Sequence, residues 1–493
     1  MEYMTNSRMD SANVERRNAE GLTRRAFIKS TLFGLTATAA VLPNALAAAE
    51  EKEAAFQENR ARNVTYLENS PLKIQEGVYK RYDSHMTAMN VLSRELGEPW
   101  STRVYANGVQ NVLNGKAYTD GPASSVAEAR AFRALQCGTD ILNMELTRYG
   151  HGMENIGQLS WRPLRVPKGL RPEDRPPDET DPKTLTKKIK TMARLVGADL
   201  VGIGPVNPNW FYTRIQRNYA APHPPFITKD ITFGDISTPT ETDTALIIPS
   251  TFTRTIVMGI SLNRVFMQTS PSAVANSMAE LGYTRMIVAV VGLSEFIRAL
   301  GYNAIPSMNG TGMSVPMAVE AGLGEVGRHG LLLTPEYGSA QRLCKVYTDM
   351  PLELDKPIDF GAVEFCKTCK KCATLCPAKA VSEDDERQWE ARTSSNNGAA
   401  FKWYNDVMKC VRFWAYNGST CAVCMAVCPF TKGAAWSHAA TRFAIDKMRF
   451  ADPAWVHLDD AFGFGELRDS SVVWDMDMST YAMDPKMVRQ TKY

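Results

Sequence analysis

Eight of the ten cysteines fall in two runs whose spacing suits redox chemistry. The first run has the pattern C-x2-C-x2-C-x3-C-P and ends at Pro377, and the second has the pattern C-x10-C-x2-C-x3-C-P and ends at Pro429. Thiolates are soft, negatively charged ligands, and four of them around a cubane of iron and sulfide form a redox centre. We therefore predict two [4Fe–4S] clusters.

The spacing also predicts how the ligands divide between the clusters. In such repeats the last cysteine of each run, which precedes proline, ligates the other cluster. The ten-residue gap after Cys410 departs from the compact form of the repeat. The predicted ligands are Cys366, Cys369, Cys372 and Cys428 for the first cluster, and Cys376, Cys410, Cys421 and Cys424 for the second.

Zinc and disulfides are the two alternatives for these cysteines. Zinc sites usually combine two C-x2-C pairs, with histidine available nearby, and a disulfide framework needs no such regular spacing. Two runs of four that both end in Cys-Pro favour iron–sulfur clusters over either. The two remaining cysteines, Cys137 and Cys344, are isolated, and we predict that each is a small buried apolar residue.

Length and composition indicate a globular protein. A chain of 493 residues that is 44% hydrophobic and 22% charged is long enough for two or three domains with large cores. The net charge of +3 is too small to indicate binding to nucleic acid or to an anionic surface.

The N-terminal segment 22–47 has the pattern of a twin-arginine signal peptide. Arg24 and Arg25 precede a short apolar run from Thr31 to Leu42, and small residues follow. The alternative is a short buried helix after a basic tail. This pathway exports folded proteins, which suits a chain whose clusters are inserted in the reducing cytosol. Because no segment reaches the roughly 18 apolar residues of a membrane span, we expect the mature chain to be soluble and to reach a membrane only through a partner.

Helices and strands must position these groups. Residues 181–206 predict an amphipathic helix followed by a buried strand, and 244–250 and 255–262 predict further strands. Ser270-Pro271 predicts a helix start, with serine as N-cap and proline at N1, and this helix extends to about Leu300. The mixture predicts an α/β (α+β) fold.

A glycine-rich segment, residues 301–349, directly precedes the first cysteine run. Glycines allow the backbone to approach a flat or bulky ligand. The segment has neither the G-K-[ST] of a phosphate-binding loop nor a G-x-G-x-x-G dinucleotide fingerprint. Tight turns between helix and strand are the structural alternative, but the position beside the cluster module favours a cofactor.

The chain as a whole resembles the respiratory reductive dehalogenases. The matching stretches are TRRAFIK, VGIGPVNPNWFYT, LGYNAIP, SVPMAVEAGLGEVGRHGLLLTPEYG, RLCKVYTDMPLELDKPIDFG and the two cysteine runs that end in CPFTK. The resemblance implies a corrinoid held base-off in a nitroreductase-like domain, and a ferredoxin-like module that delivers electrons to it. It also implies that a small organohalide, such as a chlorinated alkane or alkene, is the terminal respiratory electron acceptor.

The resemblance assigns roles to residues of this sequence. Tyr283 would give a proton to carbon, Arg342 would stabilise the resulting phenolate, and Asn309 would orient the phenol or the halogen. The residues expected to contact the corrinoid are Ser314, Val315, Pro316, Gly322 and Gly324.

The resemblance also implies an organisation and a setting. We expect a small integral-membrane anchor protein and a respiratory electron donor as partners, a location on the outer face of the cytoplasmic membrane, and either a monomer or a homodimer. Competing hypotheses are an enzyme like epoxyqueuosine reductase and an electron carrier without corrinoid. The expected parts are 1–47 as signal peptide, 48–160 as a region packing on the corrinoid domain, 161–355 as that domain, 356–435 as the ferredoxin-like module and 436–493 as a C-terminal extension.

Overall fold

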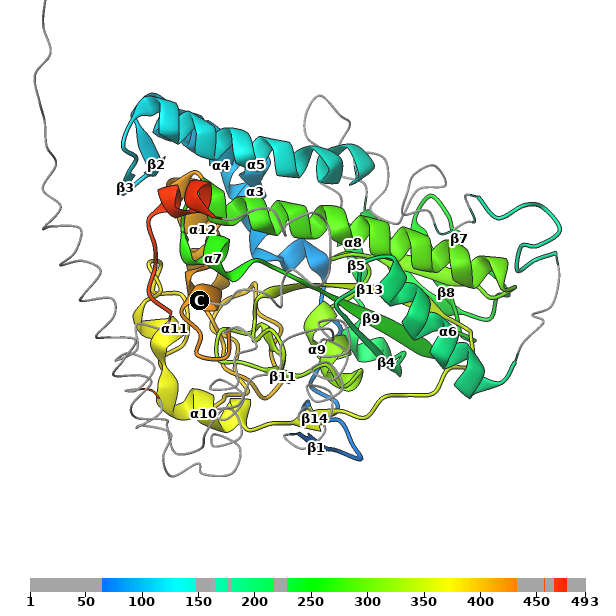
Figure 1. Cartoon of the computed structure of the whole chain (residues 1–493). Coiled ribbons are helices and arrows are strands. Elements are labelled where there is room, and N and C mark those ends of the chain that lie inside the picture. Colours follow the sequence, from blue (N-terminus) through cyan, green and yellow to red (C-terminus); the bar gives the residue numbers. More distant parts are fainter. Residues whose placement is uncertain are drawn as a thin grey trace, which may run out of the picture. The chain divides into compact units, whose positions relative to one another are not determined.

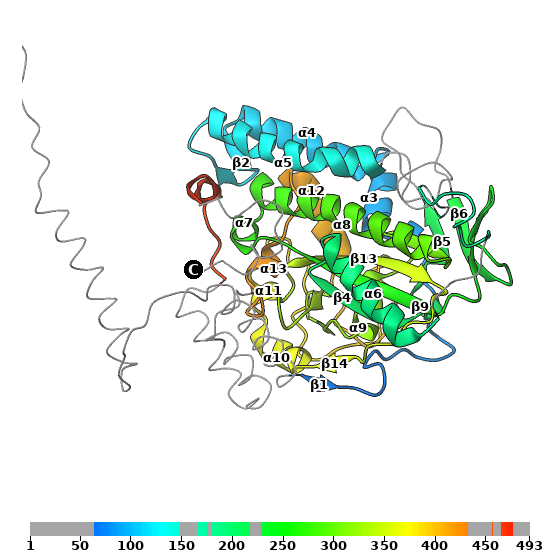
Figure 2. The same ribbon diagram turned by 45° about the vertical axis from the view of Figure 1, so that its right-hand side comes forward.

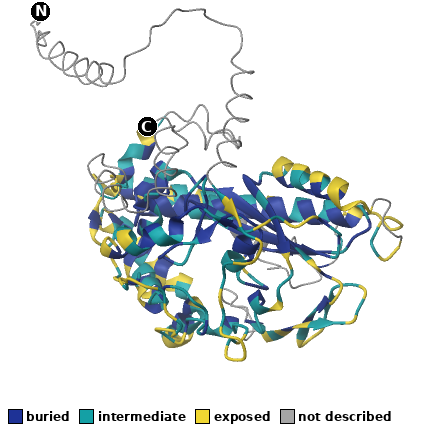
Figure 3. Ribbon diagram, turned by 90° about the horizontal axis from the view of Figure 1, so that it is seen from below, coloured by how far each residue is buried: buried dark blue, intermediate teal, exposed yellow. Residues whose placement is uncertain are grey.

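In the computed structural model, an antiparallel sheet with the strand order β10-β13-β9-β4 lies at the centre of the fold. β9 (Arg254–Ser261) pairs with β13 (Gln341–Thr348) on one side and β4 (Leu200–Pro205) on the other, and β10 (Ala304–Ser307) pairs with β13. Every residue of β9 after its first is buried. A strand covered on both faces needs apolar side chains throughout, which explains the run TIVMGIS. The buried strands stand out in Figure 3 as dark blue arrows.

Alternate side chains of the sheet enter two different cores, because successive residues of a strand point to opposite faces. Ile256 packs in the core that includes α6 (Pro182–Leu195) and α8 (Ala273–Ala299). Val257 packs in the opposite core, with α9 (Ser314–Glu320). Figure 1 shows α8 above the strands and α9 below them.

A second, mixed sheet has the strand order β5-β6-β8-β7. β6 (Thr228–Gly234) and β8 (Ala245–Pro249) run parallel, whereas β5 (Arg214–Gln216) and β7 (Thr240–Glu241) are antiparallel to their neighbours. The strands predicted at 244–250 and 255–262 are thus confirmed as β8 and β9.

The helix α5 (Val126–Thr147) lies alongside α8 in both Figure 1 and Figure 2. Its buried face includes Ala129 and Phe132. Cys137 is exposed, so the prediction that it is a buried apolar residue is wrong. At about 100° per residue, position 137 is turned roughly 140° away from Phe132 around the helix axis, toward solvent. Cys344 lies in β13 and is fully buried, as predicted.

The long helix α8 begins two residues later than its sequence predicts. Its N-cap is Ser272, whose side chain accepts a hydrogen bond from the Ala275 N–H, and Ser270 lies outside the helix. The Ser270 hydroxyl instead donates to the Met267 carbonyl, at the end of the preceding helix. The predicted end near Leu300 is confirmed, since Leu300 is the C-cap.

Shorter elements complete the fold and carry the cysteine runs. They are β1 (Thr65–Tyr66), η1 (Ser84–Met86), α3 (Ala88–Leu96), α4 (Trp100–Leu113), β2 (Lys116–Tyr118), β3 (Gly121–Pro122), η2 (Pro208–Trp210), α7 (Arg264–Gln268), β11 (Glu325–Val326), β12 (Leu332–Leu333), β14 (Ile358–Asp359), α10 (Ala362–Cys369), α11 (Lys371–Thr374), α12 (Val407–Asn417), α13 (Val423–Ala426) and η4 (Ser470–Asp475).

All of these elements belong to one compact unit, Asn59–Tyr493. The predicted α/β (α+β) class is confirmed by the two sheets and their helices. No helix in the described part of the chain has the length and apolar character of a membrane span. The predicted signal peptide lies outside the described residues, and the division into five parts stays a prediction. The structure describes residues 64–147, 161, 163, 165–174, 180–216, 228–431, 456 and 465–476.

Candidate active site and cluster module

Short helices present the cysteines of both runs. Cys366 and Cys369 lie on α10 and Cys372 on α11, and Lys370 between the two helices has a left-handed backbone with φ of 49°. This residue turns the chain so that two cysteines of one helix and one of the next lie close together. All ten cysteines are free thiols, which excludes a disulfide framework.

The first set of thiols is drawn from both runs. Burial raises the pKa of Cys366 well above its usual range, and the neighbouring thiols Cys372, Cys428 and Cys369 raise it further. Burial likewise raises the pKa of Cys369 to about 12, with a further contribution from Cys428. A cysteine of the second run therefore lies among three cysteines of the first.

The second set has the converse composition. Burial raises the pKa of Cys410 to about 12, and Cys421 and then Cys376 raise it further. Burial also raises the pKa of Cys424, and the nearby thiols of Cys421, Cys410 and Cys376 raise it further. Cys410 thus lies with the other three residues of this set despite the longer gap that follows it.

The surroundings of these thiols suit a cluster. Backbone N–H groups of Arg328, Lys371 and Val423 donate to the sulfurs of Cys366, Cys369 and Cys421, and the Ala380 N–H lies 3.3 Å from the Cys376 sulfur. Hydrogen bonds of this kind stabilise thiolate ligands and tune cluster potentials. Among the described residues, no three His, Cys, Asp or Glu side chains converge on a point that would hold one metal ion. Four thiols in each set, with backbone N–H groups donating to their sulfurs, suit a cubane.

Away from the cysteines, the structure brings together the phenol, amide and guanidinium that the sequence singled out. The side-chain amide of Asn309 donates to the Tyr283 hydroxyl oxygen across 2.8 Å. The guanidinium of Arg342 lies over the Tyr283 ring, with its central carbon 4.4 Å from the ring centroid. Tyr283 comes from α8, Asn309 follows β10 and Arg342 is the second residue of β13.

A close approach of helix and strand makes this arrangement possible. A Cβ atom on Gly282 would lie 2.9 Å from the Arg342 Cγ and 2.8 Å from the Leu262 Cδ2. Any larger residue at this position would push Arg342 away from the tyrosine beside it.

The three polar groups remain partly open to a ligand. Asn309 is exposed, and Tyr283 and Arg342 are half-buried. The Arg342 Nε is itself buried, and no acceptor within the described chain reaches it. A buried donor without a partner is costly, which is consistent with a site that a bound group completes.

Lys345 holds the loop that carries Asn309, and it was missed by the sequence-based reasoning. This lysine is fully buried, and its ammonium donates to the carbonyls of Met308 (2.5 Å) and Gly312 (3.2 Å) and to the Ser314 hydroxyl (2.8 Å). Burial lowers the pKa of Lys345 to about 7. A charged residue in the otherwise apolar strand sequence LCKVY could have indicated a buried cation, but not the loop that it binds.

The residues expected to contact the corrinoid lie around the same loop. Ser314, Val315 and Pro316 form the first turn of α9. Gly322 and Gly324 approach the protein's own backbone, since a Cβ would lie 2.3 Å from the Lys356 carbonyl oxygen or 1.9 Å from that of Leu333. Chain packing thus accounts for these two glycines, and their contact with a corrinoid stays a prediction.

The cluster module packs against the part of the fold that carries Tyr283. Ala422 and Met425, which are neighbours of Cys421 and Cys424, pack on Leu262, Met267 and Ala340. Leu262 also lies against Gly282. The second set of cysteines is therefore the one whose loop adjoins the tyrosine site.

Comparison with known proteins identifies the family to which this chain belongs. Residues 365–431 match the family described as "4Fe-4S double cluster binding domain". The chain is 40% identical over 500 residues to the tetrachloroethene reductive dehalogenase of Sulfurospirillum multivorans. The alignment covers 97% of this chain and 98% of that protein. The fold matches the catabolic reductive dehalogenase NpRdhA in complex with 3-bromo-4-hydroxybenzoic acid, with a TM-score of 0.59 at 23% identity over 86% of this chain.

This chain spans about half of that solved structure, 52% of its length. A further solved structure, with a TM-score of 0.58 at 22% identity, is described as a reductive dehalogenase that suggests a mechanism for B12-dependent dehalogenation. Both likenesses confirm the fold, and the near-complete match to the S. multivorans protein decides against an epoxyqueuosine reductase or a simple electron carrier. The chain belongs to the reductive dehalogenases, oxidoreductases that act on carbon–halogen bonds and contain two [4Fe–4S] clusters.

Proposed function

We propose that this enzyme replaces a halogen atom of a small chlorinated alkene or alkane with hydrogen, and that Tyr283 supplies the proton to the reacting carbon. The reaction consumes two electrons and one proton and releases halide as the carbon–halogen bond breaks and a carbon–hydrogen bond forms. The convergence of Tyr283, Asn309 and Arg342 from three separate parts of the chain is the observation that supports this most directly. The relationship to a tetrachloroethene reductive dehalogenase supports a chlorinated alkene as the substrate class.

The hydrogen bond from Asn309 suits a proton donor. The amide nitrogen donates to the Tyr283 oxygen, so the phenol proton is free to point toward a substrate. The same hydrogen bond becomes stronger once the phenol has given up its proton, because the acceptor is then an anion. Asn309 therefore orients Tyr283 and stabilises the product of proton transfer.

Arg342 contributes a positive charge at the same position. A guanidinium over an aromatic ring is attracted by the π-electrons, and the attraction increases when the ring carries negative charge. Two groups thus stabilise the phenolate of Tyr283, one at its oxygen and one at its face. This stabilisation lowers the barrier to proton transfer.

A corrinoid, held base-off, is the cofactor that we propose for this site. The exposed amide of Asn309 and the unpartnered Nε of Arg342 fit a site that a large bound group completes. When bound, the corrinoid supplies a reducible cobalt centre that reacts with the carbon–halogen bond. The chain's own contribution is to hold the substrate near Tyr283, exclude water and provide the proton.

The cluster module supplies the electrons. Because Ala422 and Met425 pack on Leu262 beside the tyrosine site, we propose that electrons reach the site from the second cluster and enter the protein at the first. The electron donor is then a respiratory component that docks near α10 and α11.

Export and membrane attachment are part of the proposal. Arg24-Arg25 and the apolar run after them support transport by the twin-arginine pathway to the outer face of the cytoplasmic membrane. A small integral-membrane protein would anchor the enzyme there, and a homodimer is an alternative to a monomer.

The test combines metal analysis with turnover by the anaerobically purified protein. About eight irons and one cobalt per chain, with chloride release from tetrachloroethene, trichloroethene or a chlorinated ethane, are expected for two cubanes and one corrinoid. Tyr283→Phe should abolish chloride release and keep both metals. Tyr416→Phe is the matched control, because it removes only an exposed hydroxyl that lies 3.1 Å from Asp120.

Two outcomes would contradict the proposal. Iron without cobalt, after reconstitution with a corrinoid, would leave an electron-transfer protein. Full turnover by Tyr283→Phe would exclude the phenol as the proton donor even if the enzyme is a corrinoid dehalogenase.

A further inference from the structure

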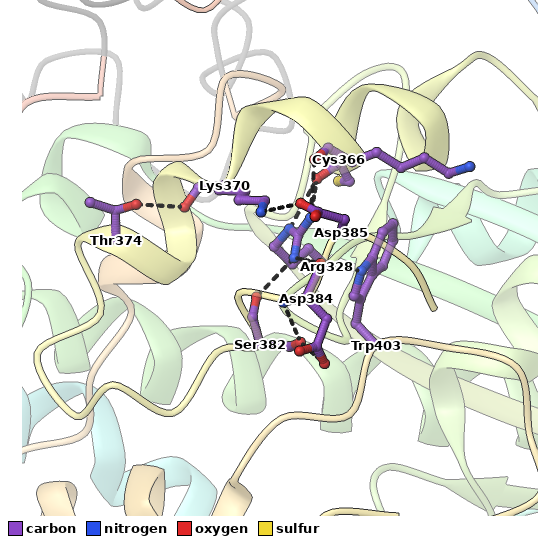
Figure 4. A network of polar contacts seen from close by, with 9 residues as sticks. Arg328, Cys366, Lys370, Thr374, Ser382, Asp384, Asp385 and Trp403 are labelled. Atoms are coloured by element: carbon purple, nitrogen blue, oxygen red, sulfur yellow. Dashed lines mark hydrogen bonds and ion pairs between the residues drawn. The ribbon is translucent and has the colours of Figure 1, made fainter. Parts of the chain in front are cut away.

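A buried arginine lies beside the first set of cysteines, and the reaction described above gives it no role. Arg328 comes from the glycine-rich segment and is fully buried. Its guanidinium donates to the carbonyl of Cys366 (2.9 and 2.7 Å) and to those of Ser382 (2.9 Å) and Asp384 (2.6 Å), with a longer contact to Lys367 (3.4 Å). Figure 4 shows the side chain surrounded by these groups.

The arginine connects the cluster-binding helix with a distant loop. Cys366 and Lys367 lie in the last turn of α10, where carbonyl groups have no partner within the helix. A cation at this end of a helix also interacts favourably with the helix dipole. The face of Trp403 covers the guanidinium, with 4.7 Å from the central carbon of Arg328 to the ring centroid. Arg328 is therefore rigidly placed.

The charge of Arg328 is not neutralised by a neighbouring carboxylate. Its hydrogen bonds within the described chain all go to neutral backbone carbonyls, and a guanidinium does not lose its proton in proteins. Two acids lie close by. The Asp384 carboxylate pairs with Arg392 (2.5 Å), and the Asp385 carboxylate pairs with Lys370, which lowers the pKa of Asp385, with a smaller contribution from Arg328. A net positive charge thus remains in a dry environment, where its field is only weakly screened.

Arg328 contacts a cysteine of the first set directly. The backbone N–H of Arg328 donates to the Cys366 sulfur, and its guanidinium donates to the Cys366 carbonyl across 2.9 and 2.7 Å. Within the described chain, the hydrogen bonds of its guanidinium go to Cys366, Lys367, Ser382 and Asp384, and none goes to a cysteine of the second set. The two clusters therefore occupy different electrostatic environments.

We propose that Arg328 raises the reduction potential of the first [4Fe–4S] cluster above that of the second. Reduction adds one electron to a cluster that already carries negative charge, and a nearby buried cation stabilises the reduced form. The proposal depends on the two clusters of the family and is independent of the roles proposed for Tyr283, Asn309 and Arg342.

The experiment is a potentiometric titration of the anaerobic holoenzyme, with each cluster followed by its electron paramagnetic resonance signal. Arg328→Gln removes the charge and keeps some hydrogen-bonding capacity. We expect the higher of the two midpoint potentials to shift to a more negative value, and the lower one to stay at the wild-type value. Arg328→Lys keeps the charge with fewer donors, so it should shift the same midpoint much less.

Arg81→Gln is the matched control. Arg81 also donates to backbone carbonyls, those of Phe211 (3.2 Å), Tyr212 (2.5 Å) and Ile231 (2.9 Å), and lies over the Phe233 ring. Its partners belong to η2 and the second sheet and not to the cysteine runs, so both midpoints should be unchanged. Equal shifts in Arg328→Gln and Arg81→Gln would overturn the proposal, as would unchanged midpoints in Arg328→Gln.

A second variant covers the case in which Arg328→Gln loses iron. Asn405 donates to the Arg328 backbone carbonyl (3.2 Å) and accepts from the Ser382 backbone N–H (2.8 Å), so Asn405→Asp introduces a negative charge beside the backbone of both residues in a side chain of nearly the same size. A more negative midpoint for the same cluster would support the proposal. Wild-type midpoints in this variant, with both clusters present, would overturn it.

Discussion

The guanidinium of Arg342 lies over the face of the Tyr283 ring, 4.4 Å from its centroid. A contact of this kind is worth about 0.5–2 kcal/mol, depending on how far it is removed from water. The two residues are 59 positions apart, so the contact exists only because α8 packs closely on the start of β13. Gly282 is the residue that permits this close packing.

Gly282→Ala should lower dehalogenation without loss of iron or cobalt. The new methyl group would lie 2.9 Å from the Arg342 Cγ, which is less than the van der Waals distance, so Arg342 must move away from the phenol. We expect the effect mainly in kcat, by about tenfold or more, because Arg342 acts on the phenolate that forms during proton transfer. Steady-state kinetics with a chlorinated ethene would measure it.

Gly138→Ala is the control for this prediction. Gly138 lies in α5, and a Cβ there would meet no atom within 4 Å. Alanine at an exposed helical position should stabilise the protein by about 0.5–1 kcal/mol and leave turnover unchanged. Equal losses of activity in both variants would show that the effect of Gly282→Ala does not depend on Arg342.

The division of the cysteines into two sets predicts which variants share a phenotype. Cys372→Ser and Cys428→Ser should perturb the same cluster, and Cys376→Ser and Cys424→Ser the other, because the structure groups the thiols in this way. Each variant should hold about four irons instead of about eight. Electron paramagnetic resonance of the reduced proteins distinguishes the two clusters.

Cys137→Ser is the matched control, since this thiol is exposed and lies on α5. It should keep the full iron content and both signals. If Cys424→Ser and Cys428→Ser instead perturbed the same cluster, the ligands would follow the order of the sequence and the crossed arrangement would be wrong.

Lys345 predicts a pH dependence of stability. Burial lowers its pKa from 10.5 to about 7, so folding disfavours the protonated form. Below pH 7 Lys345 is protonated in both the folded and the unfolded chain, and the unfavourable free energy of burying its charge is fully present. Between pH 7 and 10.5 the unfolded chain binds more protons than the folded chain, and the contribution of Lys345 therefore makes the free energy of unfolding rise with pH.

The measurement is the thermal midpoint of wild type and Lys345→Met from about pH 6 to pH 10. The wild type should gain stability relative to the variant as the pH rises through this window. Lys356→Met is the control, because Lys356 is 54% exposed and its ammonium pairs with Glu68. If the difference in thermal midpoint between wild type and Lys345→Met did not change with pH, the lowered pKa of Lys345 would be contradicted.

The arginine pair at the N-terminus predicts a specific export defect. Arg24→Lys with Arg25→Lys should leave the protein inside the cytoplasm, whereas Arg16→Lys with Arg17→Lys should not, because only the former pair directly precedes the apolar run. Cell fractionation followed by iron analysis measures the result. Export of both double variants would contradict the twin-arginine assignment.

The local pattern of the sequence was sufficient to predict many features of this protein. The spacing of the cysteines predicted two clusters, which the family match confirms, because a cubane requires thiolates at fixed separations that a short loop can supply. The crossed division of their ligands stays a prediction. Apolar runs predicted β8 and β9, since strands with both faces buried carry few polar residues. The helix α8 was predicted, although it begins at Ala273 and not at Pro271.

Contacts between distant segments could not be obtained in this way. The residues next to Arg328 and Lys345 in the chain do not indicate that Arg328 binds α10 or that Lys345 binds the Asn309 loop. Nor do the neighbours of Gly282 indicate that it lies against Arg342. Likewise, the exposure of Cys137 depends on which face of α5 meets α8. Only the tertiary structure decides such features, because hydrogen bonding and burial depend on which surfaces pack together, and residues far apart in the chain form those surfaces.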